Sequence, residues 1–173
     1  MKNFYLLLFL ALLSFCSGKK ASVQGELSFQ TRDDSELWFK NIRQSNYDLQ
    51  EEKEARINIF RHKKRDENDN LNVAIAHNWV NDMAFIMLEW DDKLSEKNSF
   101  EVFSANNGPS LPYTPGNVRQ QTEFSRKVYN LSQDSEFLYT LHEGDTIRFL
   151  STARQRDAFQ TTMEDYFRLI GID

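Results

Sequence analysis

The sequence predicts an α+β domain that is mainly antiparallel β, a sandwich or half-open barrel, with an amphipathic helix at its C-terminus. Short runs in which apolar and polar residues alternate recur from Glu26 onward, as half-buried strands require. The chain contains 14 Phe, 6 Tyr and 3 Trp but only 6 Gly and 3 Pro, which suits a packed β structure. Between Arg154 and Ile170, apolar residues recur every three or four positions, as on one face of a helix.

Two strands are expected at the start of the domain. The segments ELSFQ (26–30) and ELWFKNI (36–42) both alternate apolar and polar residues. The second segment has a helical alternative that extends over residues 36–50. Near one face of such a helix lie Trp38, Ile42 and Leu49. We expect Trp38 and Trp90 to belong to the core.

The centre of the sheet is expected from ARINIFRH (55–62), LNVAIAHN (71–78) and MAFIMLEW (83–90). The first two segments alternate, whereas the third is apolar on both faces until Glu89, as a central strand covered on both sides would be. The residues between the second and third segments are turn-like, which predicts a hairpin. Residues 100–105 predict a further short strand.

The second half of the chain begins with a loop and a helix. Residues 106–116 hold all three prolines and two of the six glycines, so we expect an irregular loop there. Residues 117–132 favour a helix, because Phe124, Val128 and Leu131 are spaced at i, i+4 and i+7.

The chain ends in a hairpin and the C-terminal helix. Residues 136–151 contain two alternating runs joined around Gly144. Either Ser151 or Thr152 is expected as the N-cap of the helix, and Gly171 stands just past its end. This succession is similar in architecture to the end of pleckstrin-homology-like domains over about the last 35 residues, a similarity that implies no ligand.

Residues 1–18 indicate an export signal. Lys2 supplies a positive charge, and residues 4–15 form an uncharged apolar run that is too short to cross a bilayer as a helix. Beyond the signal, we expect residues 19–25 to form a tether and residues 26–173 to form a single mostly-β globular domain.

Two cleavage positions compete within this signal. Bacterial lipoprotein signals are cut before a cysteine that carries diacylglycerol, and Leu13, Ser14 and Cys16 match that pattern. Phe15 departs from it, because a small residue normally stands there. With lipid on Cys16, the signal is residues 1–15 and the protein is a membrane-anchored lipoprotein of the bacterial envelope. Cleavage after Gly18 would give a periplasmic or secreted protein; we prefer the lipoprotein.

Charge and cysteine content narrow the classes of function. Beyond residue 18 the chain has 20 basic and 26 acidic residues, so no nucleic-acid partner is expected. Contact with a membrane is expected only through the lipid on Cys16. That residue is the only cysteine, so we expect the domain to fold without a disulfide, a thiol nucleophile or a thiolate metal ligand.

His77 and Asp82 are weak candidates for catalysis. His77 ends a predicted strand and Asp82 follows in the turn, and an imidazole beside a carboxylate can act as a general base. We prefer a structural role for His77, with its ring hydrogen-bonded to the turn. The three histidines lack metal-ligand spacing, and there is neither a Gly-rich phosphate loop nor a nucleophile elbow. We therefore expect no metal and no cofactor.

Two charged segments resemble binding motifs. The segment DENDN (66–70) places oxygen ligands as an EF-hand loop does, but Leu71 replaces the required glycine, so we expect a solvated turn. The segment RHKKR (61–65) looks like a phosphate-binding patch. On a strand its charges would divide between the two faces, and acidic residues follow at once, so a solvated strand end is expected.

Aromatic residues in turns and loops are the remaining candidates for a binding site. Trp79 falls in a predicted turn and Tyr113 in the proline-rich loop, and we expect both to be exposed. The sequence therefore predicts an exported, non-catalytic binding module of the cell envelope, whose partner is a protein or a surface polymer. Two alternatives stay open: a carrier of a hydrophobic ligand in a β half-barrel, and a small hydrolase or isomerase that uses His77 and Asp82.

Overall fold

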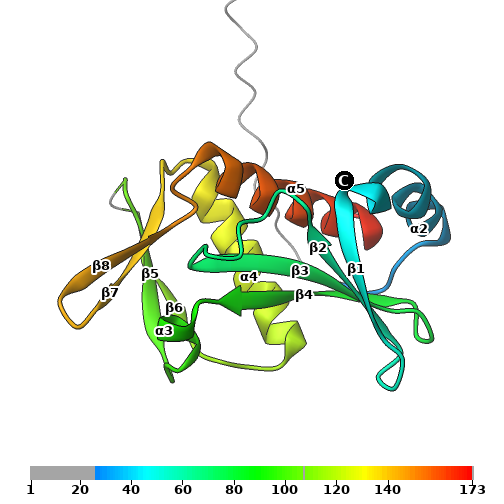
Figure 1. Cartoon of the computed structure of the whole chain (residues 1–173), viewed down its shortest axis with the longest axis horizontal. Coiled ribbons are helices and arrows are strands. Elements are labelled where there is room, and N and C mark those ends of the chain that lie inside the picture. Colours follow the sequence, from blue (N-terminus) through cyan, green and yellow to red (C-terminus); the bar gives the residue numbers. More distant parts are fainter. Residues whose placement is uncertain (1–25, 107, 173) are drawn as a thin grey trace, which may run out of the picture.

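The chain forms two four-stranded antiparallel sheets that pack with helices (Figure 1). The structure, a computed structural model, describes residues 26–106 and 108–172. All pairings between the strands are antiparallel, and neither sheet closes into a barrel. The predicted α+β class with mainly antiparallel strands and a C-terminal helix is confirmed.

The first sheet has the strand order β1-β2-β3-β4, so each strand pairs with its neighbour in the chain. Its strands are β1 (Tyr47–Glu52), β2 (Ile57–His62), β3 (Leu71–Asn78) and β4 (Met83–Trp90). The predicted hairpin of the last two strands is present, with Ile75 opposite Ile86. Both of these side chains are completely buried.

The second sheet has the strand order β6-β5-β7-β8. Its strands are β5 (Phe100–Ser104), β6 (Leu111–Tyr113), β7 (Leu138–His142) and β8 (Asp145–Phe149), and the short helix α3 (Asp92–Ser95) leads into it from the first sheet. The predicted hairpin around Gly144 is confirmed. Glu143 and Gly144 have φ values of 49° and 90°, the left-handed conformation that a two-residue hairpin loop requires.

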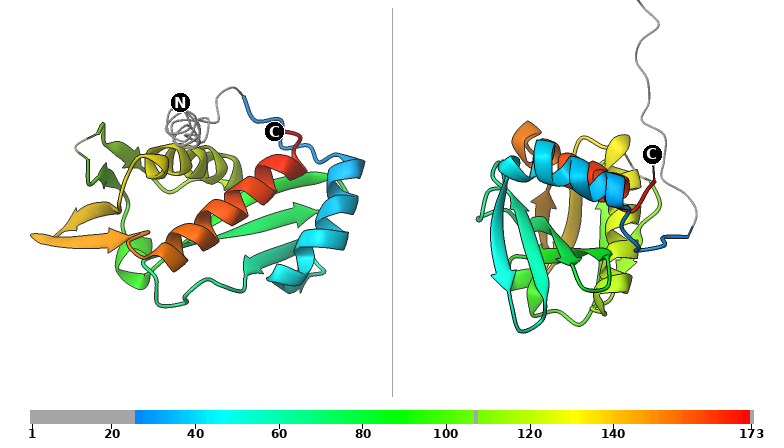
Figure 2. Two further views of the ribbon diagram at one scale, coloured as in Figure 1. Left: turned by 90° about the horizontal axis from the view of Figure 1, so that it is seen from above. Right: turned by 90° about the vertical axis from the view of Figure 1, so that its right-hand side faces the viewer.

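Two long helices pack on the first sheet. They are α4 (Val118–Gln133) and α5 (Ala153–Leu169). Seen from above, α5 runs diagonally across the sheet, while α4 lies on the side of β4 (Figure 2). Each begins with a capping box, built by Asn117 with Gln120 and by Thr152 with Gln155. Both predicted helices and the N-cap at Thr152 are confirmed, and Gly171 follows α5 with a φ of 73°.

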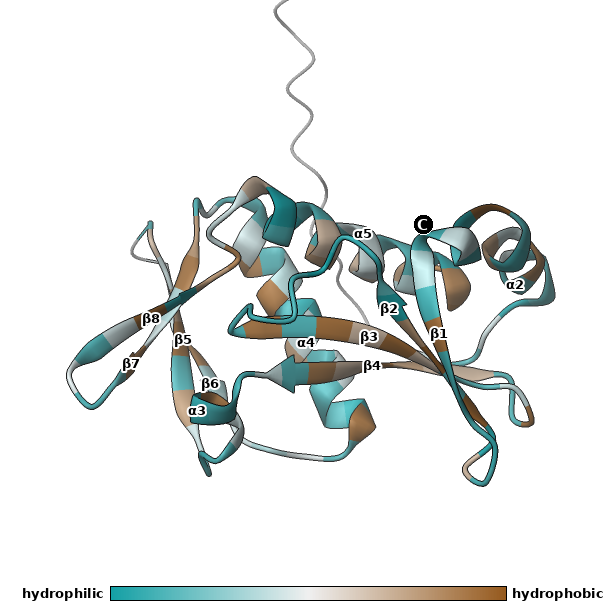
Figure 3. Ribbon diagram, viewed as in Figure 1, coloured by the Kyte–Doolittle hydropathy of each residue, from teal (hydrophilic) through white to brown (hydrophobic). Residues whose placement is uncertain are grey.

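One hydrophobic core joins the sheets and the helices. Hydrophobic residues lie along β3 and β4, whereas the loop between β2 and β3 is hydrophilic (Figure 3). From α5, Phe159, Met163 and Tyr166 enter the same cluster and are at most 3% exposed. Truncating a buried aromatic typically costs about 3–5 kcal/mol, so α5 is an integral part of the fold.

An aromatic junction, formed by Trp90 with Phe100, Tyr113, Phe124 and Phe149, connects the two sheets. The ring of Trp90, at the end of β4, lies 5.0 Å from that of Phe100 and 5.7 Å from that of Phe149, both in edge-to-face geometry. Edge-to-face pairs at this spacing add to the stabilisation from burial alone. The junction therefore fixes the second sheet to the end of the first, and it confirms Trp90 as part of the core packing.

The strand β4 differs from its prediction as a central strand, because it is the last strand of its sheet. Its open edge is covered by side chains of α4. The backbone N–H of Ile86 donates to Thr122 Oγ1 at 2.8 Å, and that of Leu88 donates to Gln121 Oε1 at 3.1 Å. A helix that satisfies an exposed edge in this way also prevents edge-to-edge pairing with another chain. The apolar sequence of β4 thus reflects cover from a helix.

The predicted strand over residues 26–30 is largely absent, because only a single bridge between Gln30 and Met83 forms. The alternation nevertheless predicts correctly which residues are buried, because Leu27 and Phe29 are buried and their neighbours are exposed. However, Phe29 has a φ of 61°, which is incompatible with an extended strand. The segment is therefore an irregular arm along β4.

The predicted strand over residues 36–42 is wrong. The helical alternative over residues 36–50 is correct as far as Asn46 and wrong beyond it, because Leu49 lies in β1. The chain forms α2 (Asp33–Trp38), the π-helical turn η1 (Phe39–Arg43) and the 3₁₀ turn η2 (Gln44–Asn46), and only then enters β1. The alternation was misleading because Leu37 and Ile42 are exposed, at 61% and 60%. Trp38 is partly buried against the core, as expected for a core residue on a helix.

In the proline-rich segment, residue 106 and residues 108–116 are irregular except for β6, a three-residue strand that the sequence did not predict. Pro112 sits in its middle, which is tolerated because β6 is an edge strand. Residues 1–18, which contain Cys16, and the tether 19–25 lie outside the described residues. Within the described part of the chain, no helix is long and apolar enough to cross a membrane.

Candidate functional site

His77 is a buried residue that pairs with a helix. It is 6% exposed, and its Nε2 lies 3.1 Å from Glu36 Oε1 in α2. The same Glu36 oxygen accepts a hydrogen bond from the hydroxyl of Thr31. Burial opposes ionisation of Glu36, but the bond from Thr31 and the nearby His77 and Lys40 outweigh it and lower the pKa of Glu36. The contact ties α2 to the end of β3.

Asp82 does not join His77 in a catalytic pair. It ends the turn before β4 with a φ of 48°, and its backbone carbonyl accepts a hydrogen bond from the Thr31 N–H at 2.8 Å. Within residues 26–106 and 108–172, no hydrogen bond or ion pair connects the side chains of Asp82 and His77. Thr31 bonds Asp82 through its backbone and Glu36, the partner of His77, through its hydroxyl, so the arrangement is typical of a structural brace.

The two aromatic candidates have different environments. Trp79 lies in the β3–β4 turn and is 41% exposed, as its position in the sequence predicts. Tyr113 is only 7% exposed, so the expectation that it is exposed is wrong. Its ring packs 4.8 Å from Phe100 and 4.9 Å from Phe124, within the aromatic junction. Because Tyr113 lies in β6, pairing with β5 turns its side chain into the core.

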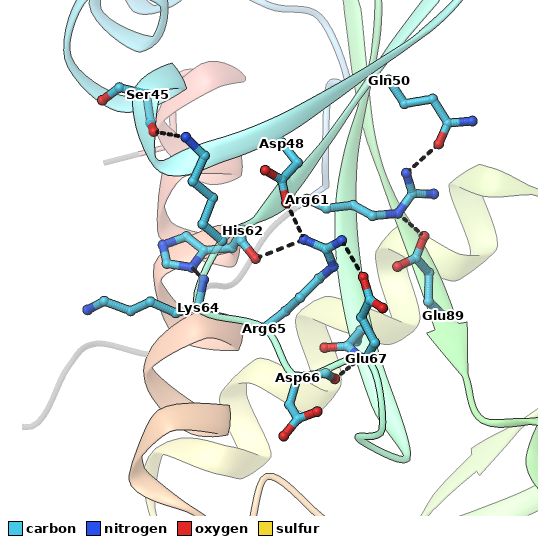
Figure 4. Close-up of polar contacts among 12 residues, drawn as sticks. Ser45, Asp48, Gln50, Arg61, His62, Lys64, Arg65, Asp66, Glu67 and Glu89 are labelled. Atoms are coloured by element: carbon cyan, nitrogen blue, oxygen red, sulfur yellow. Dashed lines mark hydrogen bonds and ion pairs between the residues drawn. The ribbon is translucent and has the colours of Figure 1, made fainter.

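The basic segment 61–65 is divided among several partners (Figure 4). Arg61 of β2 donates to Gln50 Oε1 on the neighbouring β1 at 2.7 Å, and it reaches past β3 to donate to Glu89 Oε1 on β4 at 2.7 Å. Arg65 pairs with Asp48 at 2.8 Å and with Glu67 at 3.1 Å. These two arginines are therefore largely neutralised by carboxylates.

The lysines of this segment do not divide between two faces as predicted. The strand β2 ends at His62, and the Arg65 N–H closes a turn on the His62 carbonyl at 3.0 Å. As a result, Lys63 and Lys64 both line one small cavity. The following segment 66–70 is a turn in which Asp66 Oδ1 accepts from the Asn68 N–H, the solvated turn that was expected.

An open groove of about 560 Å³ lies between α4, the arm and the proline-rich segment. The arm, residues 26–30, contributes Leu27 and Phe29, and the proline-rich segment contributes Pro112 and Thr114. From α4 come Arg119, Gln120, Glu123, Phe124 and Lys127. The groove thus brings together segments that are about 85 to 100 positions apart in the chain.

The cap of α4 fixes one wall of this groove. Asn117 accepts hydrogen bonds from the N–H groups of Arg119 and Gln120, at 3.0 and 3.1 Å, and Gln120 Oε1 accepts from the Asn117 N–H at 2.9 Å. Pro115 and Gly116 precede the cap and stop the helix from starting earlier. The first turns of α4 are therefore held firmly beside β6.

Phe29 is held in a strained backbone conformation at the opposite wall. Its φ of 61° is unusual for a bulky residue, and such conformations persist only where surrounding contacts impose them. Here the Phe29 ring stacks on Phe85 at 5.3 Å, and the guanidinium of Arg119 lies 4.6 Å above it. The Ala84 N–H also donates to the Phe29 carbonyl at 2.9 Å.

Charges of both signs surround the apolar part of the groove. Arg119, Glu123 and Lys127 come from α4, and Glu26 stands at the start of the arm. The three helix residues are spaced at i, i+4 and i+8, so they form one stripe along α4. An extended segment with an apolar side chain between charges would match this surface.

Only part of this groove is evident from the sequence. The proline-rich segment and the helix were predicted, but Tyr113 packs behind the lining residue Phe124 and does not line the groove, and Arg119 and Lys127 were not predicted. The spacing of Arg119 and Lys127 along the helix could have indicated a charged stripe. No feature of the sequence could have indicated that Leu27 and Phe29 line the groove, because this depends on how the arm crosses the molecule.

Among the described residues, no group of three or more His, Cys, Asp and Glu side chains is arranged to hold a metal ion. Comparisons with family models, with curated proteins and with solved structures find no significant match to this chain.

Proposed function

We propose that this protein is an exported, non-catalytic binding module of the cell envelope that holds a segment of a partner protein in the groove beside α4. The observation that carries the proposal is the combination of an open groove of about 560 Å³ with a strained, buttressed wall at Phe29. Export through residues 1–18 and an anchor on Cys16 are part of the same proposal and rest on the signal pattern.

A polypeptide suits this groove better than an acyl chain. Leu27, Phe29 and Phe124 supply apolar surface, and charged side chains of both signs border it. A carrier of hydrophobic cargo needs a cavity that encloses the ligand and is mostly apolar. An extended segment can instead place one apolar side chain inward and its charged neighbours against Arg119 and Glu123.

Site-specific photo-crosslinking in cells tests this proposal. Benzoylphenylalanine is placed at Thr114 and at Lys127, two exposed lining positions from different segments, and at Lys53 in the exposed β1–β2 turn as a control. We expect Thr114 and Lys127 to crosslink to the same envelope protein and Lys53 not to do so. The crosslinked segment is then identified by mass spectrometry and synthesised.

Binding of that synthetic peptide completes the test. We expect Lys127→Glu to weaken it about tenfold, the effect of reversing one charge in a partly desolvated groove, and Lys53→Glu to leave it unchanged. The proposal fails if the two groove positions capture no common protein, or if the peptide binds both variants equally well.

A further inference from the structure

A second, smaller cavity lies between the end of β2, the turn η2 and the middle of α5. Its volume is about 270 Å³, below the size of most drug-sized ligand sites and suited to a small polar group. It is separate from the groove, since the two cavities share no lining residue. Besides His62, its lining is Arg43, Ser45, Asn46, Lys63, Lys64 and Thr161, with no carboxylate among them.

The cations of this cavity retain free donors. Lys63 Nζ uses one proton to donate to the Ser45 carbonyl at 2.8 Å, and Lys64 Nζ uses one to pair with Asp157 at 2.8 Å. An ammonium group has three protons, so each lysine keeps two. Arg43 donates to Asp165 through Nε alone, which leaves the four protons of its terminal nitrogens.

The frame behind these donors is rigid. Asp165 is 4% exposed, and its two carboxylate oxygens both lie 2.9 Å from Arg43 Nε. Tyr47 donates to the same carboxylate at 2.6 Å. Arg43 is therefore fixed before a ligand arrives and loses little entropy on binding, whereas the exposed Lys63 and Lys64 are each held by one contact.

His62 contributes a neutral donor to the cavity. Its Nδ1 accepts a hydrogen bond from the Lys64 N–H at 3.1 Å, so the neutral ring carries its proton on Nε2. Burial, together with nearby Lys64, lowers the pKa of His62 and keeps the ring uncharged at neutral pH. Figure 4 shows His62 and Lys64 side by side where β2 ends.

The charge balance favours an anion. Arg43, Lys63 and Lys64 carry three positive charges, and Asp157 and Asp165 neutralise two of them from outside the lining. The lining residues come from three parts of the fold: η1 and η2, the turn after β2, and α5. A phosphate group has three acceptor oxygens and more negative charge than a carboxylate, so it can use more of these free donors. We propose that this cavity binds a phosphate group, as the free ion or as a monoester on an envelope lipid or glycan.

Calorimetric titration of the purified, processed protein tests this proposal at constant ionic strength. Inorganic phosphate represents the free ion, glycerol 3-phosphate represents the esterified group, and sodium chloride is the blank. We expect saturable binding of at least one phosphate species. Tighter binding of the ester by about tenfold identifies the ligand as a lipid or glycan phosphate, and the opposite preference identifies the free ion.

Two variants localise the site. Lys63→Gln removes one charge-assisted donor and is expected to weaken binding about tenfold, whereas Thr161→Val removes a hydroxyl and is expected to weaken it about three- to tenfold. Lys53→Gln is the matched control, because it removes the same charge from an exposed turn that does not line the cavity.

The His62 ring gives an independent signal. On addition of phosphate, but not of chloride, its imidazole proton resonances should shift as Nε2 donates to the anion. The proposal is overturned if neither phosphate species binds above the chloride blank, or if Lys53→Gln weakens binding as much as Lys63→Gln.

Discussion

Arg43 and Asp165 stand 122 positions apart in the sequence, yet Nε of Arg43 lies 2.9 Å from both carboxylate oxygens of Asp165. This pair connects the turn η1 to the last third of α5, and Tyr47 joins it from the first residue of β1. Burial raises the pKa of Asp165, although the hydrogen bonds from Tyr47 and Arg43 oppose that effect. The carboxylate of Asp165 therefore holds three elements together: η1, β1 and α5.

Replacing Asp165 with alanine is expected to destabilise the fold strongly. The change leaves the half-buried guanidinium of Arg43 and the hydroxyl of Tyr47 without their partner. Breaking a buried pair in this way typically costs about 3–5 kcal/mol. Urea unfolding followed by circular dichroism measures the free energy of unfolding.

Asp157→Ala provides the control for that experiment. Asp157 lies on the same helix and pairs with Lys64, but its side chain is 52% exposed. Exposed pairs typically contribute at most about 1 kcal/mol. If both variants lost the same free energy of unfolding, the contact between Arg43 and Asp165 would stabilise the fold no more than an exposed ion pair does.

The sequence predicted the parts of the fold in which burial follows a simple period. In β3, the large buried side chains of Leu71, Val73 and Ile75 stand at every second position, and in α5 the buried residues recur every three or four positions. In both elements the large apolar residues share one face, so their patterns are clear, although β3 also buries Ala74 and Ala76 on its other face. Prediction failed at residues 36–42, where exposed Leu37 and Ile42 imitate a strand.

Contacts between distant segments explain why the candidate sites were mostly missed. The sequence suggested His77 with Asp82, five positions away, but the structure pairs His77 with Glu36, 41 positions away. The periodicity of apolar residues predicts which face of a helix or strand a residue lies on, but it does not predict which other element will pack against that face. The cavity near His62 likewise needs Thr161 from α5, which no local pattern relates to residues 61–65.

Thr122→Val is expected to destabilise the protein by about 1–3 kcal/mol, although the two side chains have similar volumes. Thr122 is fully buried, and its Oγ1 accepts from the Ile86 N–H while donating to the Val118 carbonyl at 2.7 Å. Valine would leave that edge N–H of β4 buried without an acceptor. Amide hydrogen exchange at Ile86 and urea unfolding measure the effect.

Ser125→Ala is the comparison for the edge of β4. Ser125 is also fully buried on α4, but its hydroxyl donates to the Gln121 carbonyl of its own helix at 2.8 Å. Its removal leaves no strand N–H unsatisfied, so we expect a loss of less than about 1 kcal/mol. An equal loss for both variants would count against the role assigned to α4.

Acidification is expected to destabilise the fold through His62. Its pKa in the folded protein is lowered from 6.5 by burial and by Lys64, so the unfolded chain takes up the proton first as the pH falls. The stability due to neutral His62 is present above pH 6.5 and is lost as the pH falls from there through the folded pKa.

Urea unfolding at several pH values between 7.5 and 5 measures this effect. The His62→Gln variant should lose less stability over that range than the parent chain. Arg43, Asp157 and Asp165 also act on His62 and remain in both proteins, so the difference between the two slopes isolates the imidazole. Parallel slopes would contradict the assignment.

The mature protein is expected to carry lipid on Cys16. Leu13, Ser14 and Cys16 fit a lipoprotein signal at the end of an uncharged apolar run, and Phe15 is the one departure. A thioether-linked diacylglycerol has two acyl chains, enough for stable attachment where one chain gives only marginal binding. Cys16 and Glu26 are ten positions apart, so Glu26 at the groove would stay within about 35 Å of the attachment point.

Metabolic labelling with a clickable fatty acid tests the anchor directly. We expect the label on the wild-type chain and its loss in Cys16→Ser, with the labelled protein in the membrane fraction. An unlabelled wild-type product whose N-terminus is Lys19 would place cleavage after Gly18. The protein would then be released in soluble form, and a partner segment would have to reach the groove without the help of a shared membrane surface, which would raise the affinity that the groove itself must supply.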